Sequence, residues 1–236
     1  MFKFSKETYQ AMKNFESINH VLVFNENKSG YIGTVSEGKG CVGFYDLPSD
    51  EIQIPEFRIY DMAQFITLLD DFVKIPDYEV KFYGNHLEMM SESKGSKATY
   101  YFATKELIDS QFKVPQKPVK FPDANAVFEL TSDQLKQIIK IASIFQHEQL
   151  VFNCSSEITV SVTNVQDPTA NNWVQKIGEN RIKNADKTSV ILSIKDMKMD
   201  KTKNHMVFVV AGRIAKFVET PEGNLTYYVS PYAISK

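Results

Sequence analysis

The chain has 236 residues, a formal net charge of −2 and a hydrophobic content of 43%. This length suits two domains or one large domain, and the apolar content excludes a disordered chain. The near-neutral charge excludes a globally basic nucleic-acid binder, so any such role depends on where the lysines lie.

The first half predicts two amphipathic helices among short strands. Residues 5–16 form a helix capped by Ser5, because apolar residues recur on one face at intervals of three and four. A second helix begins at Asp61 and extends to residue 72. The strands expected around them are 21–24, 31–35, 41–45, 52–59, 79–83, 86–91 and 98–103.

The second half begins with a stiff connector. Pro115, Pro118 and Pro122 each fix φ and remove a backbone donor, which favours extended chain. An amphipathic helix follows over residues 131–145, starting at Thr131. The later elements expected are strands at 150–153, 158–162, 173–177 and 189–194, a short helix at 195–199, and strands at 206–211, 214–219 and 226–230.

The two halves show the same order of elements, and short segments echo each other. Residues 21–25 follow the first helix much as residues 149–153 follow the helix at 131–145. The sequence therefore predicts a duplicated, mostly antiparallel α+β domain with two helices per half. The expected boundaries are 1–110 and 126–236, joined by a connector at 111–125. A single large β-sandwich with inserted helices is the competing fold.

Catalytic and cofactor motifs are scarce. Residues 33–39 fit G-x-x-x-x-G-K, but Gly40 stands where a Ser or Thr must bind Mg²⁺, and a strand follows instead of a helix. The segment is therefore interpreted as a hairpin turn. The four histidines are scattered without partners at metal-ligand spacing, so no metal or cofactor is predicted. An enzyme with a site built from scattered carboxylates remains the alternative.

The cysteines and the apolar runs indicate the cellular compartment of the protein. Cys41 and Cys154 are far apart in the sequence, and the first residues lack the apolar core of a secretory signal. No apolar run approaches the ~18 residues of a membrane span. The expectation is a cytoplasmic protein with two reduced, buried thiols and no membrane contact.

Lysines cluster on the outer faces of the predicted helices. They are Lys6 and Lys13 on the first helix, Lys136 and Lys140 on the central one, and Lys195, Lys198, Lys201 and Lys203 around the last. Any one cluster is also typical of a solvated helix surface. If several of these helices cover the same side of a sheet, they form a basic surface suited to sequence-independent phosphate contact.

Four segments carry a resemblance to a known family. Residues 3–19, 58–72, 117–142 and 194–199, in this order and spacing, resemble the sliding clamps of T-even-type bacteriophages, which are DNA polymerase processivity factors. The resemblance implies two repeats of the processivity-clamp domain, with antiparallel sheets outside and helices lining the inner face. Three subunits would close head to tail around duplex DNA. The alternative within this fold is a DNA-associated scaffold that does not encircle.

The resemblance also implies partners and a location. They are the replicative DNA polymerase, an ATP-dependent clamp loader and late-transcription factors, in the cytoplasm of an infected host cell. Such a clamp is not an enzyme and needs no cofactor.

Three residue sets follow from the resemblance. The lysines expected to face DNA are Lys3, Lys6, Lys13, Lys136, Lys140, Lys195 and Lys198. The expected subunit-interface residues are Tyr100, Phe102, Trp173, Val174 and Ile177, for which ordinary sheet core is the alternative. The expected partner-peptide pocket consists of Val114, Pro115, Val119, Phe121, Tyr228, Val229 and Pro231, unless the linker simply packs on its own domain. The helix from Asp61 carries no outward lysine, which leaves its DNA contact open.

Overall fold

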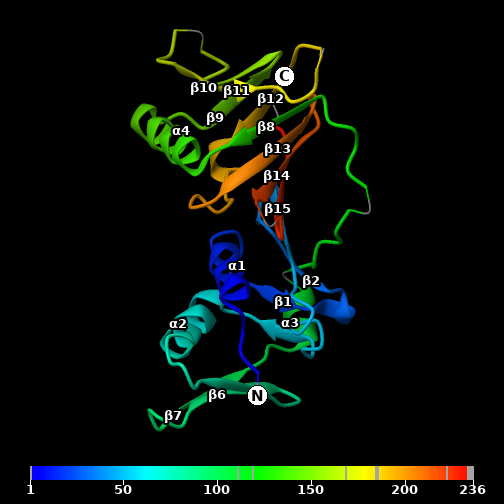
Figure 1. The fold of residues 1–236 in the computed structure, drawn as a ribbon, viewed down its shortest axis with the longest axis vertical. Coiled ribbons are helices and arrows are strands. Elements are labelled where there is room, and N and C mark those ends of the chain that lie inside the picture. Colours follow the sequence, from blue (N-terminus) through cyan, green and yellow to red (C-terminus); the bar gives the residue numbers. More distant parts are fainter. Residues whose placement is uncertain are drawn as a thin grey trace. The chain divides into compact units, whose positions relative to one another are not determined.

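The computed structural model describes residues 2–110, 112–118, 120–167, 169–183, 186–221 and 223–232. By their contacts, residues 1–35 and 44–117 form one compact unit, and residues 36–43 and 118–236 form a second. We call these unit 1 and unit 2 and describe each by itself (Figure 1).

The described residues of unit 1 contain three α-helices. They are α1 (Lys6–Glu16), α2 (Met62–Val73) and α3 (Lys105–Asp109), with a 3-10 turn η1 at Glu26–Lys28. The strands that begin in the first half of the chain are β1 (Leu22–Phe24), β2 (Tyr31–Val35), β3 (Cys41–Asp46), β4 (Phe57–Ile59), β5 (Glu79–Phe82), β6 (His86–Ser91) and β7 (Ser96–Tyr101). In this unit β1 lies between β2 and β4, and β5, β6 and β7 form a separate antiparallel sheet.

In the part of unit 2 that the structure describes, one α-helix, α4 (Ser132–Phe145), and a 3-10 turn, η2 (Ile194–Asp196), are present. Its strands are β8 (Ala126–Leu130), β9 (Gln149–Cys154), β10 (Glu157–Thr163), β11 (Trp173–Glu179), β12 (Thr188–Ser193), β13 (Asn204–Val210), β14 (Ile214–Thr220) and β15 (Leu225–Val229). One sheet has the order β11-β10-β9-β12, and the strands β15-β14-β13-β8 are neighbours in the other.

The two units repeat one topology. In unit 1, Phe2 makes an isolated bridge to Val80 of β5; in unit 2, β8 pairs with β13. Each pairing is followed along the chain by a long helix, α1 or α4. β1 then pairs with β4, just as β9 pairs with β12. The predicted duplicated, antiparallel α+β fold is therefore confirmed, and the β-sandwich alternative is wrong.

The core of unit 1 is richer in aromatic residues than that of unit 2, which is mostly aliphatic. The Phe24 and Phe57 rings stack with centroids 4.8 Å apart, and Phe65 lies against Phe57 at 6.2 Å. In unit 2 the Phe128 and Phe152 rings meet at 5.4 Å. Its remaining fully buried residues are mostly branched, such as Leu150, Val160, Val162, Leu192 and Val207.

Two local expectations need correction, and two elements were not expected. The expected strand 52–59 is only Phe57–Ile59, because residues 48–54 form turns, with the Glu51 N–H donating to the Pro48 carbonyl at 2.9 Å. The expected helix 195–199 is the 3-10 turn η2, after which Met197 and Met199 are buried alternately. The short helix α3 and the strand β8 were not expected. Ala126, Phe128 and Leu130 alternate along β8 and are all buried. Apolar residues at every second position are the sequence signal that identifies such a strand.

Candidate nucleic-acid interface and docking edges

The first basic surface is the outer face of α1. Ser5 caps the helix, its hydroxyl accepting from the Thr8 N–H at 3.1 Å. The apolar stripe, which includes Met12 and Phe15, is buried, and this orientation leaves Lys6 and Lys13 exposed. The expected surface position of these two lysines is therefore observed.

A groove separates α1 from the end of α2 in unit 1. Its lining includes Lys3, Lys6, Lys13, the rings of Tyr9 and Tyr78, and two α2-end residues, Asp70 and Lys74. The Lys13 ammonium lies 5.3 Å from the centre of the Tyr9 ring, and the Lys3 ammonium lies 5.5 Å from that of Tyr78. Lys74 adds a cation at the end of α2, a helix whose outer face was expected to carry no lysine. It is the C-cap residue, directly after the last helical residue, Val73.

The second basic surface is the outer face of α4 in unit 2. A full capping box fixes its start: the Thr131 hydroxyl accepts from Gln134 N–H at 3.2 Å, and Gln134 Oε1 accepts from Thr131 N–H at 2.9 Å. Lys136 and Lys140 are exposed one turn apart. Lys136 lies 3.9 Å from Asp133, a long contact at the surface that leaves the ammonium accessible.

The lysines around η2 are arranged differently from expectation. Lys195 is exposed and Lys198 is half-buried, and neither projects from an α-helix. Asp196 lies between them, and burial raises the pKa of its carboxyl against the opposing effect of both lysines. Its carboxylate is so close to Gly40 that a side chain there would collide with it.

In unit 1, β7 is the last strand of its sheet, and apolar side chains flank it. Tyr100 is buried, and Phe102 is half-buried with its ring 5.2 Å from that of Phe57. The exposed aromatic at this edge is Tyr101, which is 68% exposed. Together with Leu107 of α3 it lines a hollow that was not expected, although alternation along β7 places Tyr101 on the opposite face from Tyr100.

In unit 2, β11 is likewise the last strand of its sheet. Val174 is 58% exposed, and Trp173 and Ile177 are half-buried. The carbonyl of Ile177 accepts from the Gln134 side-chain amide at 3.0 Å, which ties β11 to the start of α4. Ile144, near the other end of α4, is 60% exposed and was not expected to be.

The first part of the connector packs on unit 1. Val114 packs against the cluster of Val21, Val23, Ile108 and Phe112, and Pro115 lies over Gly33, where an added Cβ would be 3.1 Å from its ring.

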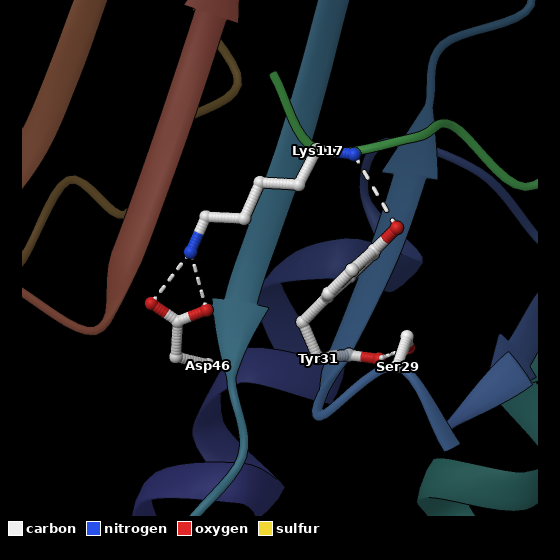
Figure 2. A network of polar contacts seen from close by, with 4 residues as sticks. All are labelled: Ser29, Tyr31, Asp46 and Lys117. Atoms are coloured by element: carbon white, nitrogen blue, oxygen red, sulfur yellow. Dashed lines mark hydrogen bonds and ion pairs between the residues drawn. The ribbon is translucent and has the colours of Figure 1, made fainter. Parts of the chain in front are cut away.

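Lys117 holds the connector to unit 1 at its end. Its N–H donates to the Tyr31 hydroxyl at 3.3 Å, and its ammonium lies 2.5 and 2.7 Å from the two oxygens of Asp46. Figure 2 shows both contacts. Tyr31 is itself held through its carbonyl, which accepts from the Ser29 hydroxyl at 3.0 Å.

The remaining pocket residues that the structure describes lie in unit 2. The Phe121 ring lies 5.8 Å from that of Tyr228, and the Lys216 ammonium lies 5.6 Å from the Phe121 ring centre. Tyr228 and Val229 are buried, so Val229 can only support a pocket from beneath, whereas Pro231 is half-buried. Val119 lies outside the described residues. The structure thus divides the predicted pocket set between the two units.

The structure also describes the residues that the sequence raised as candidates for catalysis or metal binding. The G-x-x-x-x-G-K segment is a hairpin turn, in which the Cys41 N–H donates to the Ser36 hydroxyl at 3.0 Å. Both cysteines are free and buried, and burial raises the pKa of Cys41 to about 12 and that of Cys154 to about 11. Within the described ranges no group of His, Cys, Asp or Glu is placed to hold a metal ion. A search of the same residues for a helix able to cross a membrane found none.

Sequence comparison finds relatives among phage proteins, although no protein-family model matches the chain. The chain is 25% identical over 185 residues to the sliding clamp of Vibrio phage KVP40, covering 75% of this chain and 77% of that protein. It is 24% identical over 175 residues to the sliding clamp of Escherichia phage RB69, covering 74% and 68%. The resemblance to T-even-type phage clamps is confirmed.

Structure comparison extends the likeness to nearly the whole chain. Proliferating cell nuclear antigen (PCNA) from Entamoeba histolytica matches with a TM-score of 0.71 and 12% identity, covering 96% of this chain and 95% of that one. PCNA from A. fulgidus, solved with the C-terminal region of FEN-1 bound, matches with a TM-score of 0.70 and 13% identity over 97% and 96%. The chain therefore has the two-repeat clamp fold.

Proposed function

We propose that this protein is a non-enzymatic sliding clamp, which closes as a homotrimeric ring around duplex DNA and tethers the replicative DNA polymerase. The observation that carries the proposal is the clamp fold over nearly the whole chain, together with sequence similarity to two phage sliding clamps. A bound polymerase that cannot diffuse away gains processivity through its high effective concentration at the template.

Ring closure is assigned to the strand edges β7 and β11. Each is the last strand of its sheet, one in each unit, and each has exposed apolar neighbours, Tyr101 and Leu107 at one edge and Val174 at the other. Unlike edges joined head to tail make a heterologous contact, which closes into a ring when the rotation per subunit allows it. Main-chain pairing across the junction would satisfy backbone groups that the isolated edges leave to water.

DNA contact is assigned to the lysines of α1, α4 and η2. Lys6, Lys13, Lys136, Lys140 and Lys195 are exposed, as phosphate contact requires. Contacts of lysine to phosphate carry no sequence information and are exchanged readily, so the ring can slide. The groove beside α1 extends this assignment to Lys3 and Lys74.

Partner docking is assigned to the connector and the C-terminal strand. In unit 2 the half-buried Phe121 ring packs against the buried Tyr228 ring, beside Lys216. The A. fulgidus PCNA that binds the C-terminal region of FEN-1 supports a comparable peptide site here. An ATP-dependent loader that opens the ring, and late-transcription factors as further partners, are supported by the similarity to phage clamps alone.

Light scattering on the purified protein at low micromolar concentration tests the ring. We expect the mass of three chains, and the variant Val174→Glu dissociates the trimer because it places a carboxylate in the apolar junction. The matched control is Ser189→Glu, which places the same charge at an exposed position of β12, at the other end of the same sheet, and leaves the mass unchanged.

A monomer or dimer for the unaltered protein would favour the non-encircling scaffold over the clamp. If the Val174→Glu and Ser189→Glu variants have equal masses, β11 does not lie in the subunit junction. Turnover of nucleic acid by the purified protein would instead revive the enzyme with scattered carboxylates.

A further inference from the structure

A single carboxylate stands in the groove beside α1. Among the described lining residues Asp70 is the only acid, and Lys3, Lys6, Lys13 and Lys74 are the cations. One Asp70 oxygen accepts from the Tyr9 hydroxyl and the other pairs with Lys74 one helical turn further along α2. The side chain therefore bridges α1 and α2 within the basic surface.

The contacts of Asp70 influence several charges at once. Its pKa is lowered first by the bond from Lys74, then by the bond from Tyr9, and also by the charge of Lys13. The pairing raises the pKa of Lys74, so both groups are charged at neutral pH. Tyr9 in turn lies beneath the Lys13 ammonium. Asp70 therefore holds two neighbours in place, the Lys74 side chain and the Tyr9 ring beneath the Lys13 ammonium. Its negative charge also offsets part of the positive charge of the two lysines.

We propose that Asp70 is a positioning residue that limits how strongly the α1–α2 surface holds DNA phosphate, by occupying Lys74 and supporting the Tyr9 ring under Lys13. This inference rests on the proposed clamp function. A sliding protein needs contacts weak enough to exchange at every step, and a fixed carboxylate in a lysine groove repels the same phosphates that the lysines attract.

The structure suggests a substitution that removes the charge and keeps the hydrogen bond. In Asp70→Asn the side-chain oxygen still accepts from Tyr9, so the α1–α2 packing is retained, while Lys74 loses its ionic partner. The groove gains one net positive charge. The neighbouring Asp71→Asn is the matched control, because it removes the same charge from an exposed position outside the groove lining.

The experiment measures binding of a linear duplex by fluorescence anisotropy over a series of salt concentrations, with thermal melting as a check of folding. For Asp70→Asn we expect tighter binding, on the order of threefold to tenfold at low salt, and a log–log salt slope steeper by about 0.9, because one more phosphate is neutralised. Asp71→Asn keeps the slope of the unaltered protein. In the double variant Asp70→Asn/Lys74→Gln the steeper slope returns to the original value.

The results separate this inference from the proposed function. Suppose that Lys13→Ala reduces the salt slope of the unaltered protein, but Asp70→Asn leaves it unchanged, as Asp71→Asn does. The role proposed for Asp70 is then overturned, whereas the DNA contact of the α1 lysines is supported. If the salt slope stays steeper in the double variant Asp70→Asn/Lys74→Gln, Asp70 does not act by occupying Lys74, and that part of the inference is overturned. If the unaltered protein shows no salt-dependent binding and Asp70→Asn creates none, both ideas fail.

Discussion

The helices α1 and α4 occupy the same place in the two repeats but are supported differently. Both carry two exposed lysines above a buried apolar stripe. Below α1 the stripe includes an aromatic side chain, Phe15, and α2 packs beside the helix. In unit 2 the place of α2 is taken by the short 3-10 turn η2, and α4 packs on β10.

The difference shows that the two basic faces are not equivalent. The lysines of α1 share a groove with Asp70, Tyr9 and Lys74, whereas the carboxylate beside Lys136 is 3.9 Å away and almost fully exposed. One repeat therefore holds its cations in a network between two helices, and the other presents them on a single helix. Three experiments test or sharpen this comparison.

The largest effect is expected in the core under α1. Phe15→Ala lowers the free energy of unfolding by about 3–5 kcal/mol, because a fully buried ring is removed and a cavity is left. Ile138→Ala removes part of a fully buried side chain under α4 and lowers the free energy of unfolding by about 2–5 kcal/mol. Urea denaturation measures both, with exposed Glu16→Ala as the control. A loss below about 1 kcal/mol for Phe15→Ala would contradict the assigned packing.

The next effect concerns DNA binding. Lys13→Ala and Lys140→Ala each reduce the log–log salt slope of duplex binding by about 0.9, without any change in sequence preference. Lys187→Ala, an exposed lysine just before β12, serves as the control. Salt titrations on two unrelated duplexes give the slopes. Unchanged slopes for both variants would show that these helices do not face DNA, whereas a change in only one would confine contact to one repeat.

The smallest effect is acid sensitivity, which we expect in unit 2. His205 is buried on β13, with Nε2 2.8 Å from the Asp200 carbonyl, and burial lowers its pKa below 6.5 against the opposing charges of Glu219 and Asp200. As pH falls below 6.5, His205 binds a proton in the unfolded chain more readily than in the folded chain. Stability is therefore full above it and declines as pH falls, by at most about 1.4 kcal/mol per pH unit for one group.

Hydrogen exchange measured at about pH 7 and about pH 5.5 tests the expectation. The amides of β13 lose protection in acid while those of β1 in unit 1 change less, and His205→Gln removes the difference. Equal acid sensitivity of β13 in the variant would assign the effect to other groups.

Periodicity and caps made much of the fold predictable. Ser5, Asp61 and Thr131 each accept from a backbone N–H at the helix start, as expected from residue type and spacing. Such signals are local, since a side chain satisfies a donor three residues away. The expectation failed at residues 52–56 and 195–199, where long-range contacts decide. The Asn25 side chain donates to the carbonyls of Ile52 and Ile54, which stabilises a turn in place of a strand.

The candidate site was predictable in residue type but only partly in membership. Exposed lysines follow from the polar face of a helix, so Lys6, Lys13, Lys136 and Lys140 could be selected from spacing alone. Lys74 and Asp70 could not, because their role comes from the packing of α2 against α1. Likewise Tyr101 and Ile144 are notable only because the fold leaves their side chains 68% and 60% exposed.

By itself the sequence determined the duplicated order of elements, the capped helices and the basic character of their outer faces, because these depend on residues within one or two turns of each other. Only the tertiary structure decided which acid enters the lysine groove, which strand edges end their sheets and how the connector is fastened by Lys117 to Asp46. Those outcomes join residues far apart in the chain. They arise from packing and charge pairing in three dimensions, which a linear pattern does not encode.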